Sequence, residues 1–323
     1  MRRNTLLIGL LAVVMLACSC RSNGQEQTGC DGVQAVSDTL PRSGCLLSLP
    51  DVPVSLTVPE ERAAYIIAHF WDRMDFSDTL RCRNRAFMEQ NFVNYLSLFP
   101  HAKPEALPTH IARLLERAAA DSICLDLVND LAEHYLDNPN SPMRNEEYYI
   151  LFLEGLLSLP TLPEAERIRP AYQLEMARKN RPGTTATDFA YIDRHGNRRT
   201  LHNTKGEKLM LLFYDPECEH CSEILRQVHE SNIIRNSIDK KELTILAVYT
   251  EGNRKAWDGT KNSMPQEWTV AIDESSIVER ELYALPAMPV IYLLDRDKKV
   301  MLKDAFLPEI EDVLISKMNR KTQ

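Results

Sequence analysis

Cys218-Glu219-His220-Cys221 is the segment in which residue type and spacing most clearly indicate chemistry. It follows the apolar run Leu209–Tyr214 and a short polar turn, and it precedes a stretch that is compatible with a helix. Two cysteines at this spacing at the start of a helix come within bridging distance of each other. The first also faces the free N–H groups and the positive end of the helix dipole, which favour a thiolate. The segment therefore predicts reversible thiol–disulfide chemistry, which a protonated His220 would assist and Glu219 would oppose.

A second feature, Met288-Pro289, stands directly before the apolar run that begins at Val290. Proline cannot donate to a strand ladder, so it is awkward inside a strand but suitable at its entry. A cis peptide bond there would make a fixed bend that carries free backbone groups. We therefore predict a cis Met288–Pro289 bond.

The elements that must position these residues alternate between strand and helix patterns, which predicts an α/β domain over residues 183–323. A hairpin is expected around His195-Gly196-Asn197, because this turn sequence separates two short strand-like runs. The predicted strands are 209–214, 243–249, 290–294 and 300–302, and the predicted helices follow Cys221, lie near Ile277–Tyr283, and begin at about Pro308.

This order of strand, C-x-x-C, helix and distant X-Pro resembles the thioredoxin fold, and the hairpin at its start resembles the membrane-tethered TlpA/ResA type. The resemblance implies that Cys218 attacks a partner disulfide, that Cys221 resolves the mixed disulfide, and that Met288-Pro289 binds substrate backbone. It also implies protein thiols and disulfides as partners, a membrane electron donor or acceptor, and a redox-active disulfide with no other cofactor and no metal. Leu212 departs from thioredoxin itself, which has a buried Asp at this place, and the direction of exchange stays open.

In contrast to the α/β domain, residues 57–180 are predicted to form an all-helical domain of five or six helices. Apolar residues recur at helical spacing, and prolines punctuate the segments. Thr57-Val58-Pro59-Glu60 has the spacing of a capping box and predicts a helix start. Cys124 lies on an apolar stripe and Cys82 precedes a helix, so both are interpreted as buried structural thiols. The predicted fold class is thus a helical domain followed by a thioredoxin-like α/β domain.

The first residues indicate export. A positive start precedes the apolar run Leu6–Ala17, which is shorter than the roughly 20 residues of a membrane-spanning helix. We interpret residues 1–17 as a lipoprotein signal peptide, with Cys18 acylated and inserted in the lipid membrane. Residues 18–56 then form a tether, in which Cys30 and Cys45 could pair or stay free. These features predict a lipid-anchored protein in the cell envelope of a Gram-negative bacterium, facing the periplasm.

Composition restricts the class of partner. The chain of 323 residues has 44% hydrophobic and 26% charged residues, which is typical of globular domains. Its net charge of −8 argues against a nucleic-acid partner. Three alternatives to a thiol–disulfide oxidoreductase remain: a binding or scaffold lipoprotein whose thioredoxin-like domain is structural, a zinc site that uses the C-x-x-C with an isolated ligand such as His229, and a cysteine peroxidase.

Overall fold

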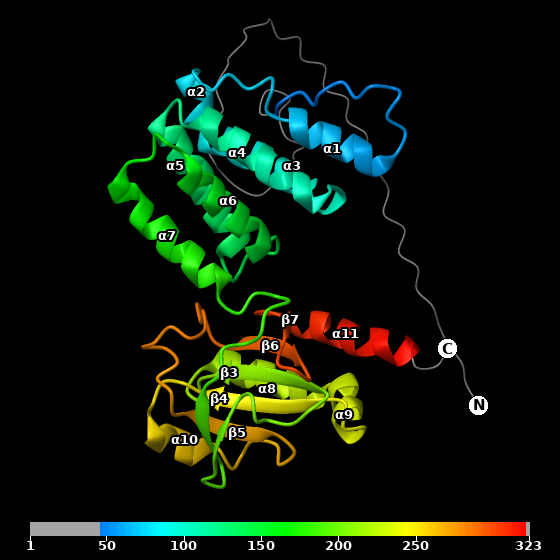
Figure 1. The fold of residues 1–323 in the computed structure, drawn as a ribbon, viewed down its shortest axis with the longest axis vertical. Helices are drawn as coiled ribbons and strands as arrows, with labels where there is room; N and C mark the ends of the chain where they lie inside the picture. Colours follow the sequence, from blue (N-terminus) through cyan, green and yellow to red (C-terminus); the bar gives the residue numbers. More distant parts are fainter. Residues whose placement is uncertain (1–45, 321–323) are drawn as a thin grey trace, which may run out of the picture. The chain divides into compact units, whose positions relative to one another are not determined.

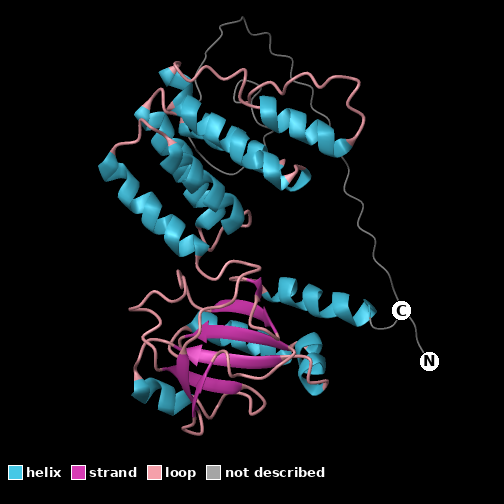
Figure 2. Ribbon diagram, viewed as in Figure 1, coloured by secondary structure: helices cyan, strands magenta, loops and turns pink. Residues whose placement is uncertain are grey.

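The computed structural model describes residues 46–320 of the chain. A region made only of helices comes first, and a mixed sheet with its own helices follows (Figures 1 and 2). The predicted fold class, a helical domain followed by an α/β domain, is confirmed. The predicted signal peptide, the lipidation site Cys18 and the possible Cys30–Cys45 pair lie outside the described residues.

The helical domain contains seven α-helices within the described residues, joined by short 3₁₀ and π segments. They are α1 (Pro59–His69), α2 (Thr79–Cys82), α3 (Arg85–Leu96), α4 (Leu107–Ala118), α5 (Ser122–Ala132), α6 (Glu146–Ser158) and α7 (Glu164–Arg178). One of them, α2, is a single turn that no periodic pattern in the sequence predicts.

Side-chain caps start several of these helices. Asp78, Asn84, Asp121 and Asn145 each accept a hydrogen bond from a backbone N–H of the first turn that follows. The capping box expected at Thr57-Val58-Pro59-Glu60 is not formed: Val58 occupies the N-cap position and makes no side-chain cap. Helix α1 instead begins with a proline, whose fixed φ and missing N–H suit the first helical position.

The core of the helical domain is built from the apolar stripes that the sequence shows. In α3, Met88, Phe92 and Tyr95 are completely buried, and in α5 so is Cys124. The end of the predicted tether joins this core as well, because Leu47 is buried and its N–H donates to Asn91 Oδ1 at 2.9 Å. Helical spacing of apolar residues therefore identified the buried faces correctly.

The α/β domain is organised around a seven-stranded sheet in the order β2-β1-β5-β4-β3-β6-β7. Strand β3 runs parallel to β4 and antiparallel to β6, and β1 and β2 form the predicted hairpin. The strands are β1 (Ala190–Asp193), β2 (Arg198–Thr200), β3 (Lys208–Tyr214), β4 (Thr244–Tyr249), β5 (Thr269–Asp273), β6 (Val290–Asp295) and β7 (Val300–Leu302). The helices are α8 (Glu219–Glu230), α9 (Asn232–Asp239), α10 (Arg254–Thr260) and α11 (Leu307–Arg320).

Strand β3 lies inside the sheet, between β4 and β6, and every one of its residues is buried. Alternate side chains point to opposite faces of a strand, so β3 contributes to two cores. Met210, Leu212 and Tyr214 join the core that includes residues of α8, α9, α10 and α11. Leu209 and Phe213 belong to the opposite core. A continuous apolar run is thus what a central strand covered on both faces requires.

One predicted element of this domain was wrong. Residues near Ile277–Tyr283 form turns, not a short helix. Ser276 and Glu281 have φ values of 53° and 50°, in the left-handed region that a right-handed helix excludes. Ile277 and Tyr283 are buried nonetheless, so the apolar spacing reflects a loop packed on the sheet. Strand β5 and helix α10 were not predicted from the sequence.

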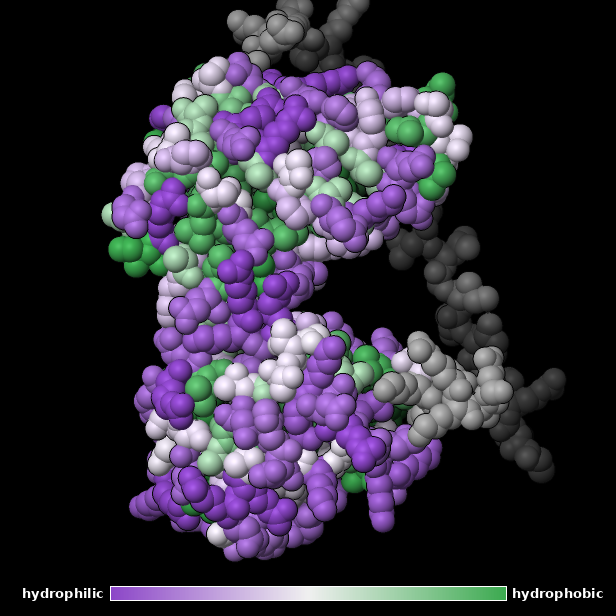
Figure 3. All heavy atoms as spheres, in the orientation of Figure 1, coloured by the Kyte–Doolittle hydropathy of each residue, from purple (hydrophilic) through white to green (hydrophobic). Residues whose placement is uncertain are grey.

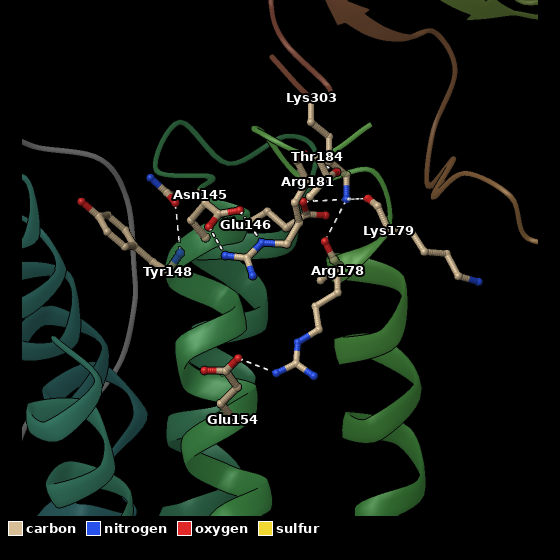
Figure 4. A network of polar contacts seen from close by, with 11 residues as sticks. Asn145, Glu146, Tyr148, Glu154, Arg178, Lys179, Arg181, Thr184 and Lys303 are labelled. Carbon is tan, nitrogen blue, oxygen red and sulfur yellow. Dashed lines mark hydrogen bonds and ion pairs between the residues drawn. The ribbon is translucent and has the colours of Figure 1, made fainter. Parts of the chain in front are cut away.

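A buried lysine joins the two parts of the described chain (Figure 4). Lys303, just after β7, donates from Nζ to the carbonyl oxygens of Ala177 and Lys179 at 2.9 and 2.7 Å. It also forms an ion pair with Glu146 at 2.7 Å, and its own side chain is only 5% exposed. The adjacent Asp304 pairs with Arg144 of the helical domain. Charged side chains, not only apolar ones, therefore form this contact.

The visible surface is mostly hydrophilic, and apolar residues show most clearly around α5–α7 (Figure 3). Ile123 on α5 and Ile168 on α7 are 50% and 72% exposed. Within residues 46–320, no helix combines the length and the apolar character needed to cross a bilayer.

Candidate active site

Strand β3 and helix α8 position the two cysteines of the C-x-x-C segment. The strand ends at Tyr214, and Asp215 then makes the turn: its carboxylate accepts the N–H of Glu217 at 2.9 Å, and its carbonyl accepts the N–H of Cys218. Helix α8 begins at the next residue, with Cys218 as its N-cap. Asp215 therefore has the turn-forming role that an aspartate at such a place commonly has.

Cys218 is the accessible member of the pair. It is half-buried, in contrast to the completely buried Cys221. Its sulfur accepts the backbone N–H of Cys221 at 3.3 Å, in the place that a serine or aspartate oxygen takes in an ordinary N-cap. This N–H and the helix dipole both favour negative charge on the sulfur. The geometry is suited to a nucleophilic thiolate that solvent and partners can reach.

Cys221 lies one turn deeper, in the core between the sheet and its helices. The N–H of Asp215 donates to its sulfur at 3.5 Å. Burial and, to a smaller extent, the neighbouring Cys218 raise the pKa of the Cys221 thiol to about 12, although the N–H of Asp215 acts to lower it. Cys221 is therefore a protonated thiol at neutral pH, out of reach of a partner protein but beside Cys218.

Glu219 and His220 occupy the first two positions of α8, and both side chains are exposed. Glu219 places a carboxylate in the first turn, where it stabilises the helix and opposes a second negative charge on Cys218. His220 lies close enough to Glu223 to contribute to the lowering of its pKa, which is due chiefly to Arg226. Both residues thus border the sulfur without covering it.

Met288 and Pro289 lie at the same edge of the sheet as the cysteines. The peptide bond between them is cis. In the antiparallel register of β3 and β6, Phe213 pairs with Val290, so the end of β3 and the start of β6 are neighbours. Met288 and Cys218 are both partly buried against the core that contains Cys221. The two segments that the sequence singled out are therefore brought to one place by strand pairing.

Leu212 is completely buried in the same core as Cys221. Its apolar side chain gives the buried thiol no carboxylate to receive a proton. His229, the isolated zinc-ligand candidate, stands beside Glu267 and the ring of Trp268. Among the described residues there is no cluster of three or more His, Cys, Asp and Glu side chains arranged to hold a metal ion.

The hydrogen bond from the N–H of Asp215 to the sulfur of Cys221 could not be predicted from the sequence. No residue type signals such a contact, because any residue except proline supplies a backbone N–H at that position. Only the sharp turn between β3 and α8 aims this group at the buried sulfur.

Comparison with known proteins agrees with this architecture. Residues 17–180 match the family model described as a domain of unknown function, DUF5106, and residues 182–303 match the AhpC/TSA family. The crystal structure of a thioredoxin-like protein from Bacteroides caccae is 36% identical, with a TM-score of 0.79 over 83% of this chain and 97% of that one. The chain belongs to this thioredoxin-like family. Its α/β part is the thioredoxin-like domain.

Two further solved structures match a smaller part of the chain. The C-terminal domain of a Bacteroides fragilis protein is 35% identical, over 42% of this chain and 98% of that one, with a TM-score of 0.41. The thioredoxin domain of a thiol-disulfide oxidoreductase from Bacteroides vulgatus is 21% identical, over 42% and 96%, with a TM-score of 0.38. Comparison with curated proteins gives no match.

Proposed function

We propose that the protein is a thiol–disulfide oxidoreductase that exchanges disulfides with partner proteins through Cys218 and Cys221. The observation that supports the proposal most strongly is the different exposure of the two cysteines. Cys218 is accessible at a helix N-terminus, and Cys221 is completely buried one turn deeper. An exchange enzyme needs this division, because one sulfur must meet the partner and the other must wait until the partner is bound.

The reaction proceeds in two displacements. The Cys218 thiolate attacks one sulfur of a partner disulfide, which breaks the partner's S–S bond, forms a mixed disulfide and releases the second partner sulfur as a thiolate. Cys221 then loses its proton to that thiolate or to water and attacks Cys218. The Cys218–Cys221 bond forms as the mixed disulfide breaks, so the partner gains two electrons and the pair loses them. The opposite sequence oxidises a partner dithiol, and a membrane donor or acceptor resets the pair.

The same proposal includes the place of action. A TlpA/ResA-type tethered enzyme, acylated at Cys18 and facing the periplasm, would act on exported proteins whose cysteines are oxidised. Metabolic labelling with a fatty acid would test the anchor. The native chain should incorporate the label, and the Cys18→Ser variant should not.

A trapping experiment tests the chemistry. The reduced Cys221→Ser protein is incubated with a disulfide-containing protein such as insulin, and mixed disulfides are mapped by peptide mass spectrometry. Because Cys221 normally releases the partner, this variant should accumulate partner joined to Cys218, whereas the matched Cys218→Ser variant should trap at least about tenfold less. Equal trapping by the two variants would refute the assigned order. Absence of both trapping and dithiol-dependent insulin reduction would favour a structural domain.

A further inference from the structure

A second pair of cysteines lies in the helical domain, outside the proposed active site. Cys82 ends α2 and Cys124 stands in the first turn of α5. Both side chains have no exposed surface, and both belong to the core of that domain. Both are free thiols in the structure. The sequence predicts each as a separate buried thiol, and the fold places both in one core.

The two cysteines are neighbours in one core, and each thiol alters the pKa of the other: Cys82 raises the pKa of Cys124, and Cys124 lowers that of Cys82. The residues beside them hold this arrangement. Asp121, the N-cap of α5, accepts the N–H of Cys124 at 3.0 Å. The same carboxylate binds Arg83, the residue after Cys82, through two hydrogen bonds. One carboxylate therefore links the backbone N–H of Cys124 to the side chain of the residue after Cys82, and the bidentate contact with Arg83 fixes its geometry.

We propose that Cys82 and Cys124 form a disulfide when the protein is oxidised, which ties α2 to α5 and serves as a structural bond of the helical domain. The oxidant is a disulfide, either of a small thiol such as glutathione or of another protein. One thiolate of the pair attacks it and releases one thiol, and the other cysteine then displaces the second thiol. Two thiols of the helical domain thus lose two electrons and two protons, and one disulfide becomes two thiols. This bond goes beyond the exchange proposed for Cys218 and does not depend on it.

Burial determines how this bond behaves. It raises the pKa of the Cys124 thiol to about 12, and it also raises the pKa of Cys82. Very little thiolate is therefore present in the folded domain, and no partner can reach either sulfur. The bond should form while the domain folds and should then resist both exchange and reduction. Since it joins two segments that are distant in sequence, it restricts the unfolded chain and stabilises the folded one.

Disulfide mapping after refolding tests the proposal. The full chain is reduced and unfolded, refolded in a mixture of reduced and oxidised glutathione, quenched with acid and alkylated. Pepsin is the suitable protease, because trypsin would cut at both Arg81 and Arg83 around Cys82. A peptide pair linked through Cys82 and Cys124 is the expected product. Recovery of both cysteines as alkylated thiols, or joined to other cysteines, would overturn the proposal.

Thermal unfolding supplies an independent readout. The midpoint of the oxidised chain should exceed that of the fully reduced chain by about 5 to 15 °C. The Cys218→Ser/Cys221→Ser double variant should keep this difference, and Cys82→Ala should lose it. If Cys82→Ala does not fold, the map of the native sequence decides alone. Loss of insulin reduction with an intact Cys82–Cys124 link would count against the proposed exchange activity only.

Discussion

The two domains each hold a pair of neighbouring cysteines, but in opposite settings. In the thioredoxin-like domain the pair spans one turn at a helix start, with Cys218 half-buried. In the helical domain the pair joins two different helices, and both Cys82 and Cys124 are completely buried. Closeness of two sulfurs is common to both sites, so it cannot by itself indicate exchange chemistry.

The difference lies in what surrounds the sulfurs. The sulfur of Cys218 receives a backbone N–H at the positive end of a helix dipole, which favours its thiolate. Cys82 and Cys124 stand near the carboxylate of Asp121, and burial and this charge both oppose ionisation. The first environment favours rapid exchange, and the second favours a bond that persists once formed.

The largest expected effect concerns Cys221, which resembles the helical-domain pair more than it resembles Cys218. With a pKa of about 12, its thiolate fraction at pH 7 is about 3000-fold lower than that of an ordinary thiol. In the Cys218→Ser protein, which lacks the contribution of the Cys218 thiol but keeps the burial, alkylation of Cys221 by iodoacetamide should be slower than that of a free cysteine by about a hundredfold or more. Peptide mass spectrometry would measure the rate at this one cysteine.

The pH dependence of this rate follows from the same pKa. Thiolate increases tenfold per pH unit at every pH below the pKa, so the alkylation rate of Cys221 should keep rising from pH 7 to 9 without a plateau. Cys218 in the Cys221→Ser protein is the matched comparison and should react faster because its sulfur is accessible. A plateau in the alkylation rate of Cys221 below pH 9 would contradict the difference in thiol ionisation that we infer between Cys221 and Cys218.

The sequence predicted the first pair better than the second for a physical reason. Cys218 and Cys221 are local neighbours, so spacing, the preceding strand and the following helix suffice to place them. Cys82 and Cys124 come together only in the tertiary structure, as members of one core, and α2 is too short to carry a periodic signal. The burial of Cys124 was predictable from the apolar stripe on which it lies, but its closeness to Cys82 was not.

The fold shows the same division between local and tertiary information. The hairpin and the buried strands β3, β4 and β6 were recognisable from apolar runs and turn residues. The loop at Ile277–Tyr283 was not, because apolar spacing reports burial and does not reveal left-handed residues such as Glu281. Nor does composition indicate that Lys303 is buried, since lysine is rarely so unless it is paired.

Lys303 tests whether the two cysteine environments are independent. In Lys303→Met the Glu146 carboxylate, whose side chain is 20% exposed, loses its cation, and two backbone carbonyls lose their donor. Breaking a buried pair in this way costs about 3 kcal/mol of unfolding free energy. Urea denaturation would measure it, with the exposed Arg226→Met as a control that should change much less. Neither Cys218 alkylation nor the Cys82–Cys124 link should change.

The pH dependence of the Lys303→Met variant gives a further check. Burial raises the pKa of Glu146, so the folded chain binds a proton there more readily than the unfolded chain. The ionised Glu146 carboxylate therefore lowers the free energy of unfolding at neutral pH. This free energy increases as the pH falls and the carboxylate takes up a proton. Without the lysine this pKa rises further, and the deficit relative to the native chain should shrink between pH 7 and 5. A deficit that grows toward pH 5 would contradict this account.

The smallest effect is expected at Asp121, and it bears directly on the helical-domain pair. Asp121→Ala removes the cap of α5 and the partner of Arg83, and should lower the thermal midpoint of the reduced chain by about 2 to 4 °C. Asn145→Ala is the matched control, because it removes a cap from α6 that touches neither cysteine. Both variants should lose similar stability, but only Asp121→Ala should reduce the yield of Cys82–Cys124 linked peptide on refolding. Equal yields of the linked peptide from the two variants would mean that core packing alone aligns the two sulfurs. The Asp121 carboxylate would then contribute stability without directing formation of the disulfide.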